Sequence, residues 1–173
     1  MTRLRQAFLV LGLSFGVTGC GFHPLYAPRS GEGGGAQAEF GAIQTALIPE
    51  RSGQLVRQAL QQRLDRGTAQ AKRYELSVSF SLAADAIGFQ QDTTITRLRL
   101  VGTATWTLKA IDPPNATVTN GLARSLDGVN ILDQQYFEAD LAGQAATQRI
   151  ADALADQITL QLATYFARTP AAS

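Results

Sequence analysis

Residues 74–82 read Tyr-Glu-Leu-Ser-Val-Ser-Phe-Ser-Leu, in which large apolar residues alternate with polar ones. Because successive side chains of a β-strand point to opposite faces, this alternation predicts a strand with one buried face. Residues 97–108 continue the pattern, with Leu98, Leu100, Gly102, Ala104, Trp106 and Leu108 on one side and Arg97, Arg99, Val101, Thr103, Thr105 and Thr107 on the other. The two stretches predict neighbouring strands of a meander, joined by a polar hairpin end over residues 85–94.

Two further strands are predicted on either side of this pair. Pro113-Pro114-Asn115 marks a turn, and residues 117–126 form a weaker third strand of the meander, in which Asn120 and Arg124 interrupt the alternation. Residues 40–48 are predicted as the first strand, which ends at Pro49. The pattern leaves open whether this first strand pairs at one edge of the meander or at the other.

Helical spacing replaces the alternation in two places. Apolar residues recur at positions 55, 56, 59, 60 and 64, which predicts an amphipathic helix with Ser52 as its N-cap and Gly67 just beyond its end. Near the C-terminus, apolar residues recur at positions 150, 154, 158, 162 and 165. The second helix is predicted to begin between residues 135 and 143 and to end before Pro170.

The predicted order is therefore β-α-β-β-β-α, an α+β fold. Two helices and four strands, each apolar on one side, can bury those sides in a two-layer sandwich, with two helices packed on one face of a four-stranded mixed sheet. Residues 40–168 are predicted to form this single domain, and residues 169–173 a disordered tail. The other sheet face is rich in Ser, Thr and Arg, so it is either ordinary solvated surface or the floor of a binding site.

The N-terminus has the pattern of an export signal. Arg3 and Arg5 precede a mostly apolar stretch over residues 7–17, which is too short to span a bilayer. The run Val-Thr-Gly-Cys at residues 17–20 resembles the lipobox of bacterial lipoproteins. That resemblance implies a signal peptide over residues 1–19, an acylated Cys20, and a lipidated N-terminus with a flexible linker over residues 20–39. The alternative is a secreted protein with one free thiol.

Charge and motifs exclude several classes of function. The chain has 15 Lys and Arg against 14 Asp and Glu; without Arg3 and Arg5 the balance is 13 − 14, or −1. A nucleic-acid partner is not expected, because such proteins carry a basic patch or stripe. His23 is the only histidine, and no Gly-x-Ser-x-Gly motif occurs. We therefore expect no catalytic residues, no metal, and no cofactor beyond the covalent lipid on Cys20.

Several segments taken together resemble the LptE family of lipopolysaccharide-assembly lipoproteins, particularly its alphaproteobacterial members. The segments lie at residues 20–26, 55–60, 74–78, 94–100, 104–108 and 136–137. The resemblance implies a non-enzymatic lipoprotein, anchored by Cys20 on the periplasmic face of the outer membrane. It also implies that the chain plugs the LptD β-barrel, which inserts lipopolysaccharide into the outer leaflet. Gly21, which is not the aspartate of an inner-membrane retention signal, agrees with outer-membrane sorting.

Candidate contact residues follow from the polar sheet face. Arg97, Arg99 and Arg124 are predicted to contact lipopolysaccharide phosphates, because guanidinium groups bind phosphate in a bidentate manner. Alternatively they are solvated or pair with carboxylates of the barrel. Gln90 and Gln91 occupy a hairpin position where the family can carry a basic residue. The sequence leaves open whether lipopolysaccharide binds directly, which face meets the barrel, and whether the chain is instead an accessory lipoprotein of another envelope complex, in barrel assembly or lipid transport.

Overall fold

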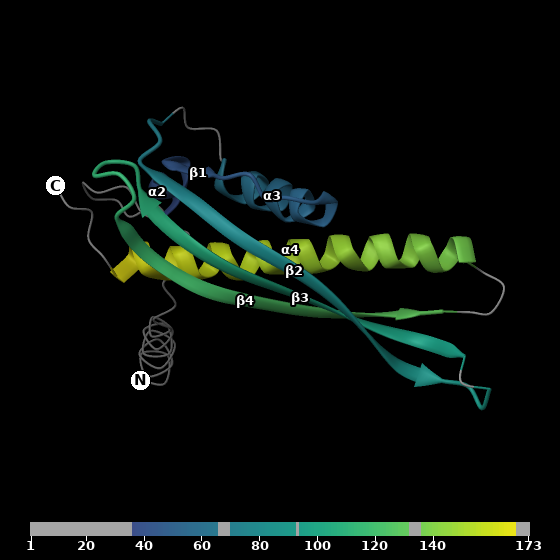
Figure 1. Cartoon of the computed structure of the whole chain (residues 1–173). Coiled ribbons are helices and arrows are strands. Elements are labelled where there is room, and N and C mark those ends of the chain that lie inside the picture. Colours follow the sequence, from purple (N-terminus) through teal and green to yellow (C-terminus); the bar gives the residue numbers. More distant parts are fainter. Residues whose placement is uncertain (1–35, 66–69, 93, 132–135, 169–173) are drawn as a thin grey trace, which may run out of the picture.

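The computed structural model describes residues 36–65, 70–92, 94–131 and 136–168. The described chain contains seven elements, in the order α2 (Ala36–Gly41), β1 (Ile43–Thr45), α3 (Arg51–Leu64), β2 (Tyr74–Phe89), β3 (Ile95–Ala110), β4 (Thr117–Asn130) and α4 (Tyr136–Arg168) (Figure 1). The predicted signal peptide, Cys20, Gly67 and the tail over residues 169–173 lie outside the described residues. None of the described helices has the length and apolar character needed to cross a membrane.

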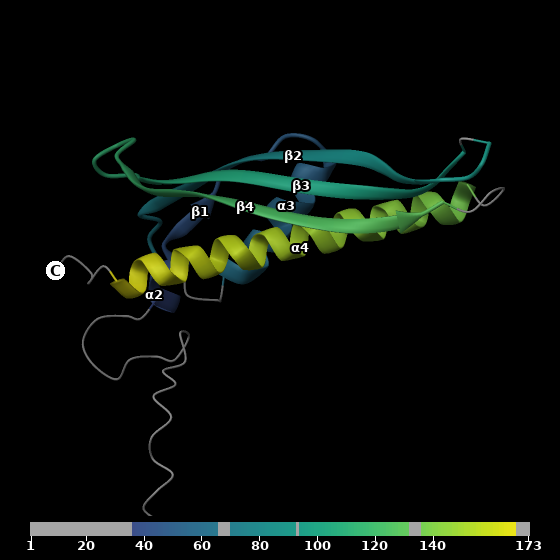
Figure 2. The same ribbon diagram turned by 90° about the horizontal axis from the view of Figure 1, so that it is seen from below.

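The strands form one mixed sheet in the order β1-β2-β3-β4. β1 runs parallel to β2, and β2–β3 and β3–β4 are antiparallel pairs (Figures 1 and 2). The first strand therefore joins the meander beside β2, which decides the edge that the sequence left open. Parallel neighbours need a crossover connection, and α3 provides it.

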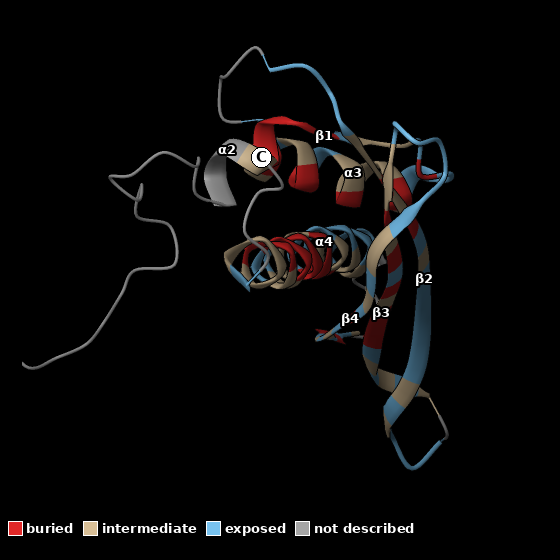
Figure 3. Ribbon diagram, turned by 90° about the vertical axis from the view of Figure 1, so that its left-hand side faces the viewer, coloured by how far each residue is buried: buried red, intermediate tan, exposed pale blue. Residues whose placement is uncertain are grey.

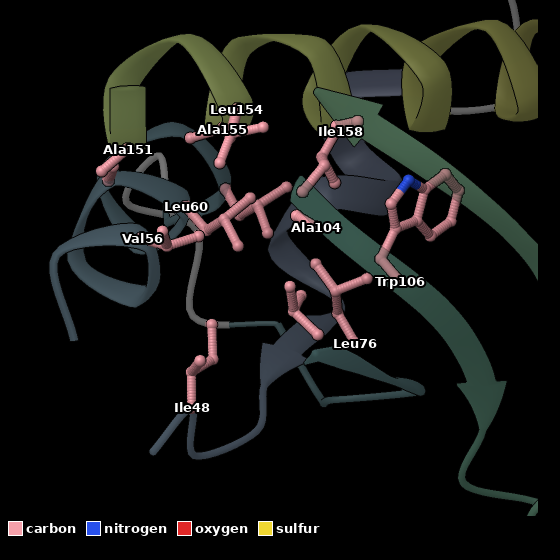
Figure 4. Close-up of a cluster of buried hydrophobic side chains, with 14 of the residues drawn as sticks. Ile48, Val56, Leu60, Leu76, Ala104, Trp106, Ala151, Leu154, Ala155 and Ile158 are labelled. Carbon is pink, nitrogen blue, oxygen red and sulfur yellow. The ribbon is translucent and has the colours of Figure 1, made fainter. Parts of the chain in front are cut away.

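All the described helices lie on one face of the sheet, as Figure 3 shows from the end of the molecule. α4 packs along β4 and β3, and α3 packs beside α4. The core between the layers has large side chains that are almost fully buried, including Trp106, Ile48, Leu60, Leu76, Leu154 and Ile158 (Figure 4). Phe40 and Leu108 belong to the same core. The predicted α+β two-layer architecture and the inner faces of residues 74–82 and 98–108 are confirmed.

The first strand is shorter than predicted. Residues 40–48 were expected to be extended, but Phe40 lies in α2 and only Ile43–Thr45 pair with β2. Phe40, Ala42, Ile43 and Ile48 are all buried, a spacing that a regular strand with one buried face cannot produce. α2 also begins at Ala36, inside the segment that composition assigned to the linker.

The ends of the other elements differ as well. α3 begins at Arg51, and Glu50 takes the cap position with φ 67° and no capping side-chain hydrogen bond, so Ser52 lies in the first turn and is not the cap. β2, β3 and β4 all extend toward the hairpin tip beyond their predicted ends. Asp85 pairs across the strands with Arg99. The first half of the polar hairpin end, residues 85–89, therefore belongs to β2, with register shifts after Ala86, and Gln90 N–H donates to Thr94 O across the turn.

Candidate binding surface of the sheet

The face of the sheet opposite the helices, here called the outer sheet face, is not covered by any described element (Figure 3). At its centre, hydroxyl side chains of β2 and β3 lie side by side, namely Ser77, Ser79, Ser81, Thr103, Thr105 and Thr107. Polar side chains on an uncovered face need no partner within the chain, because water satisfies them. The outer sheet face is thus a broad hydrophilic surface on a twisted sheet, with the apolar core behind it (Figure 1).

Arg97 and Arg99 form a cationic pair at one end of this face. They lie two residues apart on β3, so their side chains share the face. Arg99 Nη2 is 3.1 Å from Asp85 Oδ2, and both side chains are about half exposed (49% and 51%). An exposed pair of this kind contributes only about 0–1 kcal/mol, so an anionic ligand could compete for Arg99 at little cost.

The guanidinium group of Arg97 lies near Gly128 of β4, the residue opposite Arg99. A Cβ atom on Gly128 would lie 3.4 Å from Arg97 Nη2, so the guanidinium group lies over the bare backbone of β4. Within the described residues, Arg97 forms no ion pair. Arg97 is therefore the better placed of the two guanidinium groups to bind an external anion.

Arg124 lies on the same face but away from that pair. It is opposite Thr103, whereas Arg99 is opposite Gly128. Four residues along a strand correspond to roughly 13 Å. The structure therefore brings Arg97 and Arg99 together and places Arg124 nearer the middle of the face.

Gln90 and Gln91 lie at the tip of the β2–β3 hairpin, at the same end as Arg97, which pairs with Gly88. The turn is closed by Gln90 N–H, which donates to Thr94 O (2.9 Å). Thr94 N–H donates to Asp92 Oδ1 (3.0 Å), and this hydrogen bond holds the pKa of Asp92 below its ordinary value. The tip is thus a defined polar turn that extends the cationic end of the outer sheet face.

Three exposed apolar residues near the hairpin tip were not among the contact residues predicted from the sequence. Ile87, Phe89 and Ile95 are 46%, 61% and 39% exposed. A signal for two of them was present, since Ile87 and Phe89 occupy the two alternate positions that follow Asp85. The end of the sheet therefore combines guanidinium groups, amides and apolar side chains, which suits an amphiphilic ligand better than a purely polar one.

Two exposed leucines on β4 flank Arg124. Leu122 and Leu126 are 58% and 66% exposed, and their register with Thr105 and Val101 places them on the outer sheet face. Their spacing of two from Arg124 could have identified them. The β4 side of the face is thus more apolar than its serine- and threonine-rich centre.

The helix side of the sheet has a groove of about 680 Å³. Its lining comes from the start of α3, the first half of α4, and the two strands between them, including Arg51, Leu55, Leu82, Leu100, Asp140 and Thr147. Nothing in the sequence predicted this groove, because its walls are far apart along the chain. Within the described residues, no cluster of His, Cys, Asp and Glu could hold a metal ion.

Comparison with known proteins agrees with this architecture. A presumed lipoprotein from Caulobacter crescentus CB15 is 25% identical, with a TM-score of 0.61 over 78% of this chain and 97% of that one. A minor lipoprotein from Acinetobacter baumannii (14% identical, TM-score 0.57, 71% and 91% covered) and the rare lipoprotein B from Shewanella oneidensis (12%, 0.53, 71% and 92%) have the same fold.

Curated protein sequences contain no match to this chain. The sequence profile of the LptE family, described as lipopolysaccharide-assembly, matches residues 40–162. That range covers the described domain from the end of α2 to the last turns of α4. The chain therefore belongs to the LptE family, a lipoprotein family of lipopolysaccharide assembly.

Proposed function

We propose that this chain is a lipid-anchored outer-membrane protein that plugs and supports the LptD β-barrel, and that the two together place lipopolysaccharide in the outer leaflet. It acts by binding and catalyses no reaction. The outer sheet face carries this proposal. β2 and β3 are each 16 residues long, so the face extends about 50 Å, and a wide membrane barrel has a polar interior that is often plugged.

Cys20 supplies the anchor in this proposal. Each buried methylene of an acyl chain contributes about 0.8 kcal/mol, and stable anchoring needs two signals, such as a second chain. An acylated Cys20 would hold the domain at the inner leaflet of the outer membrane, beneath the barrel. The residues between Cys20 and α2 would set how far the domain reaches.

Purification from membranes tests the partnership. The full-length chain is expected to co-purify with one large outer-membrane barrel protein, because a plug and its barrel form one complex. Depletion of the chain is expected to remove lipopolysaccharide from the cell surface while other barrel proteins still assemble. A general loss of barrel proteins would instead indicate the accessory role in barrel assembly, and co-purification with no barrel protein would contradict the plug.

We further propose that Arg97 and Arg99 contact the phosphates of lipopolysaccharide at the cationic end of the outer sheet face. Replacing both by glutamine is expected to weaken binding of purified lipopolysaccharide about tenfold or more, since charge-assisted hydrogen bonds contribute about 1.5–3 kcal/mol each. Titration of lipopolysaccharide into the purified protein measures the effect.

The matched control replaces both arginines by lysine, which keeps the charge and removes the bidentate geometry. An intermediate affinity is expected for this variant. Arg124→Gln, at the middle of the face, is expected to have a smaller effect than the double change. Unchanged affinity of the double glutamine variant would show that Arg97 and Arg99 are solvated residues or contacts for the barrel.

A further inference from the structure

The rest of the fold covers one long edge of the sheet, that of β4, and leaves most of the other edge, that of β2, open. α4 lies alongside β4, whereas β2 forms the opposite border beyond the short β1 (Figure 2). The edge of a sheet exposes unpaired backbone N–H and C=O groups, which can pair with another chain. A strand of another chain can therefore bind only along an edge where these groups are not already bonded within the fold.

The edge of β4 is capped by side chains of α4. Gln157 accepts from Arg124 N–H (3.2 Å) and donates to Arg124 O (3.0 Å), which reproduces the pair of bonds that a neighbouring strand would make. Gln161 donates to Leu122 O (3.0 Å). Asp127 accepts from Gly128 N–H (2.7 Å) and also from Arg149 Nε (2.7 Å). Much of the outward backbone of β4 is thus already occupied.

The edge of β2 has no such cover after its first residues. β1 pairs only with residues 74–76, and Ala46 N–H donates to Leu76 O (3.0 Å) as the last bond on this side. Because strand backbone groups alternate in direction, the N–H and C=O groups of Val78, Phe80, Leu82 and Ala84 point to the same open side. In the described part of the chain, no strand or side chain bonds to them.

The open stretch also lacks the usual features that discourage pairing. Residues 78–86 have an unbroken register with β3, and the first irregularity follows Ala86. They contain no proline or lysine, and Asp85 is their only charged residue. Natural edge strands are normally protected by such residues, by bulges or by a covering element. An edge that is long, regular and unprotected is a site for strand addition.

The groove on the helix side lies beside this edge. Leu82 and Leu55 both line it, and Leu82 is 37% exposed. A strand added to β2 would place one of its side chains about 4.5–5.5 Å from Leu82 on the same face, where the groove can receive it. In strand addition, backbone hydrogen bonds supply the affinity and pockets for alternate side chains supply the specificity.

We propose that residues 78–86 of β2 accept an extended segment of the partner barrel protein as an added strand, with an apolar side chain of that segment in the groove. This inference rests on the proposed function, because it takes the barrel as the partner. A closed barrel wall has no free strand edge, so the segment comes from a loop or a terminal arm of the barrel protein.

Two other occupants fit less well. The chain's own residues 20–35 include Pro24, Pro28 and several glycines, which are poor strand formers. A second copy paired antiparallel about Leu82 would place its own Leu82 beside the groove, but its contact would consist of this one nine-residue edge, and a specific dimer normally buries about 1,200 Å² or more. In the proposed function the barrel protein also meets the outer sheet face, so an added strand from it extends a larger interface.

Hydrogen exchange on the purified complex tests the proposal directly. The amides of residues 78, 80, 82 and 84 are expected to exchange quickly in the isolated chain and roughly a hundredfold more slowly in the complex. The outward amide of Arg124 on the β4 edge, which already donates to Gln157, serves as the matched control and is expected to change little. An intact complex without slowed exchange at residues 78–84 would overturn strand addition and leave the proposed function standing.

A variant gives a second, independent readout. Ala84→Pro removes one outward N–H without touching the ladder to β3, because proline is tolerated at the open side of an edge strand. It is expected to lower the amount of co-purified barrel protein about tenfold, which corresponds to about 1.4 kcal/mol. Ala84→Thr, which keeps the N–H, is expected to retain it.

Three other outcomes of these experiments would contradict strand addition by the barrel protein. Equal recovery of the barrel protein with Ala84→Pro would contradict it. Slowed exchange that appears in the isolated chain and rises with its concentration would identify a second copy as the occupant, and so overturn the choice of partner. If no barrel protein co-purifies with the unaltered chain, the proposed function fails and this inference fails with it.

Discussion

Replacing Trp106 with alanine is expected to lower the free energy of unfolding by about 3–5 kcal/mol, the usual range for a large buried aromatic side chain. Trp106 lies on the inner face of β3 and is 2% exposed. Its Nε1–H donates to Gln161 Oε1 (2.9 Å), and the same amide donates to Leu122 O on β4. The change therefore leaves a cavity and also disrupts the link that holds α4 to the sheet.

Urea denaturation of the purified protein, followed by circular dichroism, measures this effect. Trp106→Phe is the matched control, since it keeps an aromatic ring and loses only the N–H and part of the volume. Gln161→Ala isolates the hydrogen bonds, each with a net contribution of about 0.5–1.5 kcal/mol. A loss below about 1 kcal/mol for Trp106→Ala would show that this site is not the centre of the core.

Replacing Gly102 with alanine is expected to destabilise the fold by about 1–3 kcal/mol, the range for overpacking a core. Gly102 is on the inner face of β3, under α4. A Cβ atom there would overlap Ile150 Cγ2 and would lie 3.3 Å from Leu154 Cδ1. The missing side chain thus sets how closely α4 approaches the sheet, and any larger residue must push the helix away.

A double-mutant cycle separates this clash from a general effect of losing glycine. Ile150→Leu removes the Cγ2 atom that the added Cβ atom would meet and keeps the side-chain volume. The pair Gly102→Ala and Ile150→Leu is expected to lose less stability than the sum of the two single changes, with a coupling of about 0.5 kcal/mol or more. Strict additivity of the unfolding free energies would show that the two residues are not in contact.

Alternation and helical spacing were sufficient to predict the central strands, the two long helices and the faces they bury. Leu76, Ala104 and Leu108 are inward because the side-chain period of a strand is two residues, and this period can be read without knowing the partner strand. The same rule placed Arg97 and Arg99 together on the opposite face. Fold class and the cationic pair could therefore be derived from local pattern alone.

Element ends were less predictable. Asp85 reads as part of a polar loop, but it lies within the continuous pairing of β2 with β3, opposite Arg99. Ser52 is a good helix cap by composition, yet the chain enters α3 through Glu50, where φ is positive. For Asp85, pairing with a strand outside the local window overrides local preference.

The sequence by itself determined the two-layer arrangement and the polar character of the uncovered face, because both depend on side-chain periodicity within single elements. Only the tertiary structure decided that β1 joins beside β2, that Arg124 lies roughly 13 Å along the sheet from the level of Arg99, and that Gln157 caps β4 while β2 stays open. The physical reason is that hydrogen bonds between strands, and between a helix and an edge, join residues 31 to 39 positions apart in the chain, and no local pattern records which of them meet.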